Sequence, residues 1–174
     1  MRTRTLVRFS TFIVVCVLFL SGNSQTIDLS GEWKFALDSL NKGEKQEWFK
    51  KELQGKIKLP GTTDQSGYGE NHIEGDLLPD GKPEIWQLAR KKNYIGAAWY
   101  QKEIIISEDW RGRSVFLELE RCMWQTKVWV NGRYVGEGHS LCAPHKFNLT
   151  SLLLPGENTI SVRIDNSPYV HLGS

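Results

Sequence analysis

The sequence predicts an all-β sandwich. Two observations carry this prediction. First, short apolar runs recur at fairly even spacing from residue 28 onward, several of them alternate with polar residues, and Gly, Pro, Asn and Asp separate them. Second, only residues 44–53 have a convincing helical pattern. Seven or eight short strands with one incidental helix are typical of a two-sheet domain.

Length and composition set the outer limits. The 174 residues exclude a complete (β/α)8 barrel, which needs about 250. A composition that is 40% hydrophobic and 24% charged does not support disorder. Without Arg2, Arg4 and Arg8, 19 basic residues stand against 20 acidic ones. We therefore expect neither a nucleic-acid partner nor binding to an anionic membrane.

The first 24 residues have the pattern of a cleaved secretory signal peptide, which predicts an exported protein and a mature domain of residues 25–174. Basic residues precede an apolar run, residues 9–20, that is shorter than the roughly 20 residues of a membrane span. Gly22 and Ser24 are the small residues that signal peptidase requires before Gln25. The alternative is an uncleaved anchor helix. After cleavage, no membrane association is expected.

In the first half of the mature chain, residues 32–37 (EWKFAL) and 56–59 predict strands. Residues 44–53 (EKQEWFKKEL) predict a helix with a narrow apolar stripe. Residues 62–93 are polar and rich in Gly, and this is long for a loop inside a compact domain. Such loops bind ligands, cap a site or are mobile.

The second half predicts the clearer strands. Residues 125–130 run into Asn131-Gly132, the strongest short hairpin signal in a sequence. Along residues 159–164 (TISVRI), Ile160, Val162 and Ile164 share the face that points inward. The other predicted strands of this half are residues 98–106, 114–120, 133–135 and 145–149.

No catalytic, cofactor-binding or metal-binding constellation is present. Glu118 and Glu120 share a strand face, but a flat solvated face does not place substrate between two carboxyl groups as a glycosidase does. No nucleophile elbow, Walker loop or dinucleotide fingerprint occurs. The histidines lack the spacing of metal ligands and are expected to have structural or surface roles: His72, His139, His145 and His171.

Aromatic residues are dense in the central strands, namely Trp99, Tyr100, Trp124, Trp129 and Tyr134. Planar rings suit sugar recognition because the C–H faces of a pyranose stack on them. The alternative is a Trp-rich core. Trp129 faces away from Val128 and Val130, so it is either on the outer face or packed under the long loop.

Two further features leave alternatives open. Cys122 and Cys142 could pair in an oxidising compartment, or each could be a small apolar residue in a separate element. Asn148-Leu149-Thr150 is a glycosylation sequon, and the same residues can cap the turn that follows.

Several segments in order resemble glycoside hydrolase family 2. They are IDLSGEWKFALD at 27–38, LPGTTD at 59–64, WYQK at 99–102, VWVNGRYVGEGHS at 128–140 and FNLTSLLLPGENTISVRIDN at 147–166. The resemblance is to the N-terminal sugar-binding domain of β-galactosidases and β-glucuronidases, a jelly-roll β-sandwich like other galactose-binding domains. It covers about residues 27–166, nearly the whole mature chain.

The resemblance implies a retaining β-glycosidase whose two catalytic glutamates lie on a C-terminal barrel. Nothing here matches those glutamate motifs, so no residue is assigned a catalytic role, and this polypeptide alone is expected to have no glycosidase activity. In some members, loops of this domain help to shape the sugar subsite. The matching places in this chain make Asn93, Tyr94 and Asn166 the candidate substrate contacts.

The leading functional hypothesis is an accessory domain of an exported retaining β-glycosidase, with a glycan or β-glycoside as substrate and the catalytic barrel as partner. The chain stops where the family sequence continues into an immunoglobulin-like domain and then the barrel, which suggests a fragment or a truncated gene product. The alternatives are a free-standing carbohydrate-binding module and a purely structural sandwich. No cofactor is expected under any of the three hypotheses.

Overall fold

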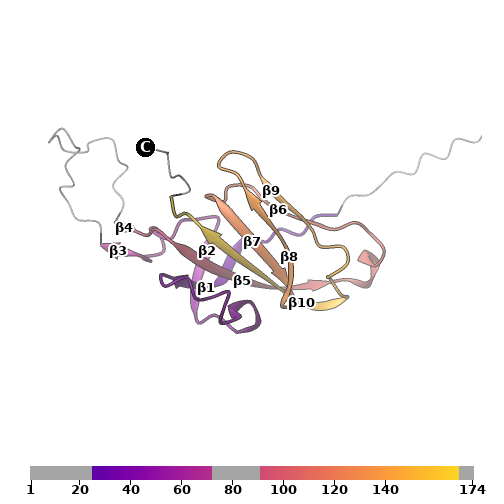
Figure 1. Ribbon diagram of the computed structural model, residues 1–174. Coiled ribbons are helices and arrows are strands. Elements are labelled where there is room, and N and C mark those ends of the chain that lie inside the picture. The colour runs from indigo at the N-terminus through magenta and orange to yellow at the C-terminus, as the bar shows by residue number, and fades with distance from the viewer. Residues whose placement is uncertain (1–24, 72–90, 169–174) are drawn as a thin grey trace, which may run out of the picture.

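The computed structural model describes residues 25–71 and 91–168 (Figure 1). The predicted leader, His72, His171 and most of the predicted polar loop lie outside the described residues. The described strands are β1 (Gly31–Asp38), β2 (Gly55–Leu59), β3 (Glu70–Asn71), β4 (Lys92–Asn93), β5 (Ala97–Ile106), β6 (Phe116–Leu119), β7 (Gln125–Val130), β8 (Arg133–His139), β9 (His145–Asn148) and β10 (Gly156–Asp165).

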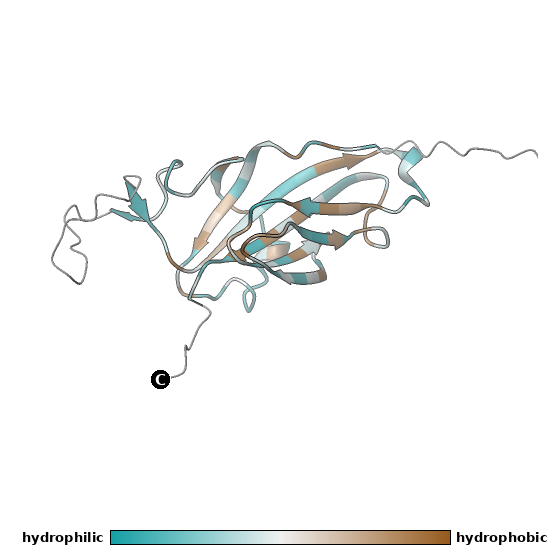
Figure 2. Cartoon of the chain, turned by 90° about the horizontal axis from the view of Figure 1, so that it is seen from above, coloured by the Kyte–Doolittle hydropathy of each residue, from teal (hydrophilic) through white to brown (hydrophobic). Residues whose placement is uncertain are grey.

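The predicted β-sandwich is confirmed. A six-stranded antiparallel sheet has the order β2-β1-β5-β10-β7-β8, and the pair β6-β9 lies over it (Figure 1). Apolar residues of both layers form the main core between them, among them Phe35, Val128 and Val162 from the large sheet and Leu117 and Phe147 from the small one. Brown and teal alternate along these strands in Figure 2, as expected where alternate side chains enter a core.

The two long central strands are buried on both faces over residues 97–101 of β5 and 160–163 of β10. On β10, Ile160 and Val162 enter the main core as predicted, while Ser161 and Arg163 are buried on the opposite face. On β5, Trp99 is fully buried on that second face. The segment of residues 39–54 covers it, and it places Leu53 beside Trp99 and Trp129.

The predicted helix over residues 44–53 is wrong in its extent and kind. Only Trp48–Lys50 forms a 3-10 helix, η1, and a second, η2, spans Glu108–Trp110. Glu47 has a left-handed backbone with φ of 54°, which a right-handed helix does not accept. Gly43 approaches Trp99 so closely that a Cβ there would overlap the indole nitrogen. The apolar residues of the predicted stripe therefore do pack on the sheet, but they lie on an irregular segment and not on a helix.

The local predictions about turns agree with the structure. Asn131 and Gly132 have φ of 51° and 74°, the left-handed pair of a tight hairpin turn between β7 and β8. The Asn148 side chain accepts a 3.0 Å hydrogen bond from the Thr150 amide. This contact is the turn-capping alternative for the sequon.

Candidate functional site

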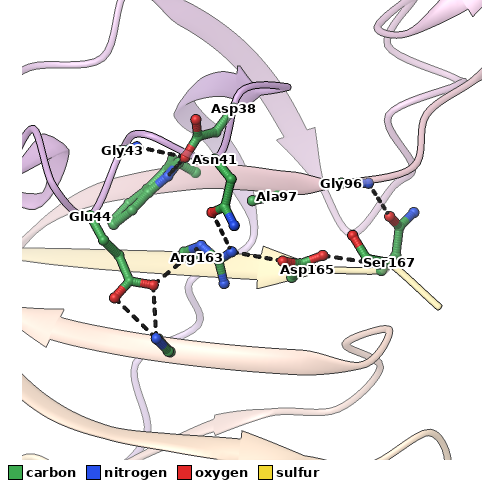
Figure 3. Close-up of polar contacts among 12 residues, drawn as sticks. Asp38, Asn41, Gly43, Glu44, Gly96, Ala97, Arg163, Asp165 and Ser167 are labelled. Atoms are coloured by element: carbon green, nitrogen blue, oxygen red, sulfur yellow. Dashed lines mark hydrogen bonds and ion pairs between the residues drawn. The ribbon is translucent and has the colours of Figure 1, made fainter. Parts of the chain in front are cut away.

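Two of the three candidate sugar contacts meet at the end of β10, where the chain leaves the large sheet. Asn166 Oδ1 accepts a 2.7 Å hydrogen bond from the Gly96 amide (Figure 3). The Asn166 Nδ2 donates to the Tyr94 carbonyl at 2.8 Å. The Asn166 side chain therefore anchors the last residues of β10 to the segment that enters β5. The rest of its surface is exposed to solvent.

The Tyr94 side chain is half-buried beside this anchor. Its hydroxyl donates a 2.6 Å hydrogen bond to the Ala97 carbonyl, so its proton is already committed. Burial raises the pKa of Tyr94, and the nearby carboxylates of Asp38 and Asp165 add to this shift. A neutral phenol whose proton is engaged can still accept a hydrogen bond from a sugar hydroxyl.

The third candidate, Asn93, is exposed in the short strand β4 and pairs with Glu70 of β3. It is next to Tyr94 in the chain, at the edge of the part that the structure describes. A contact of Asn93, Tyr94 or Asn166 with sugar stays a prediction.

A buried charged cluster lies directly behind this end of β10, and sequence reasoning missed it (Figure 3). The Arg163 side chain is only 4% exposed. Its Nη2 donates to Asp165 Oδ2 at 2.7 Å and to Asn41 Oδ1 at 2.8 Å. Glu44 Oε1 lies 3.5 Å from Arg163 Nε and also receives Lys127 Nζ at 2.8 Å. Three parts of the chain distant in sequence, the segment after β1, β7 and β10, are thus joined by ion pairs and hydrogen bonds.

The cluster holds the covering segment and the chain exit together. Asp38 accepts the Gly43 amide at 2.8 Å and the Trp99 indole N–H at 3.0 Å, which fixes the start of the segment on the sheet. Asp165 Oδ1 accepts the Ser167 amide at 2.9 Å on the exit side. Sequence alternation did indicate which face Arg163 and Asp165 occupy, but it could not show that this face is covered.

Asp165 stays charged because its partners outweigh its burial. Desolvation raises the pKa of this carboxyl, whereas the hydrogen bonds from Ser167 and the nearby Arg163 guanidinium lower it, and the net shift is downward. The end of β10 therefore presents a fixed, ionised carboxylate at neutral pH.

The aromatic residues are mostly core. Trp99, Tyr100 and Trp129 are buried, and Phe49 of the covering segment stacks on Trp129 with 5.0 Å between ring centroids. Trp129 is thus packed under residues 39–54, and neither on the outer face nor under the predicted polar loop of residues 62–93. Of the five central rings, only Tyr134 is exposed, at 52%. A continuous aromatic platform for sugar is absent from the described strands.

A cavity of about 320 Å³ lies between η1 and the rims of β1, β5 and β10. Its polar groups are already paired: Lys34 contacts Glu52 at 2.8 Å and Glu103 at 2.7 Å, and the buried Gln101 amide bonds to Lys51 and Leu53. Because these donors and acceptors already bond to other groups of the protein, the cavity is a weaker candidate for sugar binding than the end of β10.

The remaining sequence features carry no chemistry in the structure. Glu118 and Glu120 are on the exposed side of the small sheet. Cys122 and Cys142 are free thiols. Across residues 25–71 and 91–168, His, Cys, Asp and Glu form no group that could hold a metal ion. The same residues include no helix with the length and apolar character needed to cross a bilayer.

The described fold defines the class: a two-layer antiparallel sandwich with an anchored chain exit. Residues 26–170 match the family model described as "Glycosyl hydrolases family 2, sugar binding domain". The chain therefore belongs to this family, in agreement with the resemblance seen in the sequence.

Relatives and solved structures of this family are similar over most of the chain. It is 28% identical over 140 residues to a β-glucuronidase of Paenibacillus borealis, covering 80% of this chain and 21% of that protein. It is 32% identical over 102 residues to a β-galactosidase of Thermoanaerobacter pseudethanolicus, covering 57% and 14%. The crystal structure of Ruminococcus gnavus β-glucuronidase superposes with a TM-score of 0.61 at 20% identity, covering 79% and 20%. The chain thus spans about a fifth or less of these proteins.

Proposed function

We propose that this chain is the N-terminal sugar-binding domain of an exported, retaining β-glycosidase that acts on β-glucuronides, β-galactosides or related glycosides. The observation that carries the proposal is the family match over residues 26–170. The end of β10, with Asn166, Tyr94 and Asn93, is the part of the domain that contributes to the sugar subsite. Bond cleavage belongs to a catalytic barrel in the same enzyme.

The test is a turnover assay with a panel of chromogenic β-glycosides. The enzyme encoded by the complete reading frame is expected to hydrolyse at least one of them and to release the sugar with its anomeric configuration retained, which NMR follows directly. The 25–174 chain is expected to be inactive. Turnover by the 25–174 chain, or an inverted product from the complete enzyme, would contradict the proposal.

A second candidate function is a purely structural sandwich that touches no sugar. The burial of Trp99, Tyr100 and Trp129 favours it over a free-standing binding module, which needs exposed rings. In the complete enzyme, Asn93→Ala should raise KM by a few-fold under the main proposal, because one hydrogen bond contributes about 1 kcal/mol. Under the structural alternative, KM is unchanged.

Export is tested separately. Mass spectrometry of the secreted protein is expected to find Gln25 as the first residue. Val14→Arg, which places a charge in the apolar run, should retain the precursor in the cell, whereas Val14→Leu should not. Secretion of the Val14→Arg precursor would argue against a signal peptide.

A further inference from the structure

Two loops at the same end of the β7–β8 hairpin each carry a cysteine. Cys122 precedes β7 and Cys142 follows β8. The Cys122 side chain is half-buried and Cys142 is exposed, and both are thiols in the structure. No other cysteine occurs in residues 25–174 of the sequence, so within this domain each thiol has one possible partner.

The strand register aligns these two residues with one another. Strand pairing joins the first residue of β7 to the last residue of β8. The Ser140 amide then donates to the Trp124 carbonyl at 3.2 Å, so the same register extends one residue beyond both strands. Continued for two more residues, it aligns Cys122 with Cys142. Opposed residues of antiparallel strands have Cα atoms about 4.5–5.5 Å apart, and a disulfide spans about 4.4–6.8 Å between Cα atoms.

A chain of hydrogen bonds also joins the two cysteine loops. The Cys122 thiol is hydrogen-bonded to Thr126. Thr126 Oγ1 lies 2.7 Å from Nδ1 of the buried His145, and His145 Nε2 lies 3.1 Å from the Ser140 carbonyl. The Ser140 hydroxyl accepts the Cys142 amide at 3.2 Å. Contacts through Thr126 and His145 thus hold the two loops in place relative to one another.

The two thiols differ in the way that a stepwise oxidation requires. Cys142 is exposed, so a small disulfide in solution reaches its sulfur. Burial raises the pKa of the Cys122 thiol, and the hydrogen bond with Thr126 offsets part of this shift. Cys122 is therefore a protonated thiol at neutral pH and is expected to react with a sulfur held beside it much faster than with an oxidant in solution.

We propose that Cys122 and Cys142 are an oxidisable pair that forms a disulfide bridge after export. The Cys142 thiolate attacks the disulfide bond of an oxidant such as oxidised glutathione, which forms a mixed disulfide and releases one thiol. The Cys122 sulfur then attacks the Cys142 sulfur, which forms the bridge, breaks the mixed disulfide and releases a second thiol. In total, two protein thiols give up two electrons and two protons, and the oxidant disulfide is reduced to two thiols.

The bridge braces the end of the large sheet at which β10 ends. Trp124, two residues after Cys122, donates its indole N–H to the Ser167 carbonyl at 2.8 Å. The covalent loop of residues 122–142 contains the whole β7–β8 hairpin. Of the proposed function, this inference rests on export alone, because export supplies an oxidising compartment.

The test maps disulfides by mass spectrometry in the complete enzyme, equilibrated with reduced glutathione in about tenfold excess over the oxidised form. The wild type is expected to yield the Cys122 peptide linked to the Cys142 peptide as its main form. Cys122→Ala and Cys142→Ser are expected to be mostly reduced, because a single thiol can form only a mixed disulfide and reduced glutathione reverses it. With oxidised glutathione alone, Cys122→Ala should accumulate the mixed disulfide at Cys142, whereas Cys142→Ser should leave Cys122 reduced.

Hydrogen exchange then shows whether the bridge braces this end. The amides of Cys142 and Ala143 donate to the Ser140 hydroxyl at 3.2 Å and 2.8 Å. The Ala143 amide is expected to exchange at least about tenfold more slowly in the oxidised enzyme than after reduction, because the bridge restricts local opening. In Cys142→Ser, the same amide should show no dependence on reduction. Equal rates in oxidised and reduced wild type would argue against the bracing role.

Two results would overturn the pairing and leave the proposed function standing. One is a wild type in which Cys142 carries glutathione while Cys122 stays reduced, and the other is a bridge from either residue to a cysteine elsewhere in the enzyme. If the bridge forms in glutathione buffer but the protein is retained in the cell, the pairing is supported and export is refuted.

Discussion

Over residues 97–101 of β5 and 160–163 of β10, both faces of the large sheet are buried, yet the side chains on the two faces differ in chemistry. The face toward β6 and β9 packs apolar groups such as Tyr100 and Val162. The face under residues 39–54 mixes Trp99 with the buried Gln101 and Arg163. A sheet that packs against another sheet needs only apolar alternation, whereas one covered by irregular backbone must also satisfy the amides and carbonyls of that cover.

Gln101 illustrates this requirement. Its Oε1 accepts the Leu53 amide at 3.0 Å and its Nε2 donates to the Lys51 carbonyl at 2.7 Å. The covering segment closes its own turns with backbone hydrogen bonds as far as Lys51, but the Lys51 carbonyl and the Leu53 amide find their partner in a side chain of the sheet. The stability of the face under residues 39–54 is therefore expected to depend on specific hydrogen-bonded and charged pairs. The stability of the face toward β6 and β9 is expected to depend on how well apolar side chains fill the core.

The largest loss of stability is expected at Trp99, a large apolar side chain that is fully buried on the covered face. Trp99→Ala removes a fully buried ring that packs on Trp129, and it leaves Asp38 without the indole donor. We expect a loss of about 3–5 kcal/mol in the free energy of unfolding, measured by urea denaturation. Ile105→Ala, on the same strand and face but exposed, should change it by no more than about 0.5 kcal/mol. If Trp99→Ala lowered the free energy of unfolding by less than about 1 kcal/mol, packing of residues 39–54 on the sheet would contribute little to stability.

A somewhat smaller loss of stability is expected at Arg163. The comparison of the single variant with a double variant then tests whether Arg163 and Asp165 act as a pair. Arg163→Met leaves the buried Asp165 carboxylate without its cation and should destabilise the domain by about 3 kcal/mol. Adding Asp165→Asn removes the stranded charge, so the double variant should be more stable than Arg163→Met alone. Additive losses in this double-mutant cycle would show that the pair does not act as a unit.

The same pair predicts a pH dependence specific to the second face. Because the pKa of Asp165 is lower in the folded protein, its contribution is present above the unfolded pKa of about 3.9 and is lost as the pH falls through the folded value. Unfolding free energy measured from pH 6 down to pH 2 should therefore fall less steeply for Asp165→Asn than for the wild type. Val162→Ala, on the apolar face, should lower the whole curve without changing its slope. Parallel curves for Asp165→Asn and wild type would refute the assignment.

The apolar face could be predicted from the sequence and the covered face could not. The alternation of Ile160 and Val162, and the Asn131-Gly132 turn, follow from local rules of strand and hairpin formation. Burial of Arg163 depends on Asn41 and Glu44, about 120 positions earlier, folding back over the sheet. Alternation alone assigns such a residue to solvent, because one-sided burial is the usual case for an antiparallel sheet.

The candidate site was predicted only in part, for a related reason. Family resemblance indicated Tyr94 and Asn166, and the structure places them in contact. The role of Asn166 as an anchor for Gly96 depends on the β5–β10 register, which no local pattern encodes. The error over residues 44–53 has the same origin. The spacing of Trp48, Phe49 and Leu53 fits a helix, but tertiary contacts with Trp99 and Trp129 select an irregular path.

The smallest change in stability is expected for an ion pair at the exposed rim of the face under residues 39–54, in contrast to the buried pair in its interior. Lys34 pairs with Glu52 at 2.8 Å, but the Glu52 side chain is 67% exposed, so water screens the pair. Lys34 lowers the pKa of Glu52, which shows that the contact favours the charged form. Glu52→Gln should lower the free energy of unfolding only slightly, and 1 M NaCl should abolish the difference. The loss in Arg163→Met, by contrast, should survive the same salt, because the Arg163–Asp165 pair lies beneath the cover and mobile ions do not reach it. Equal salt sensitivity of the two variants would mean that residues 39–54 open readily in solution and that the second face is buried only part of the time.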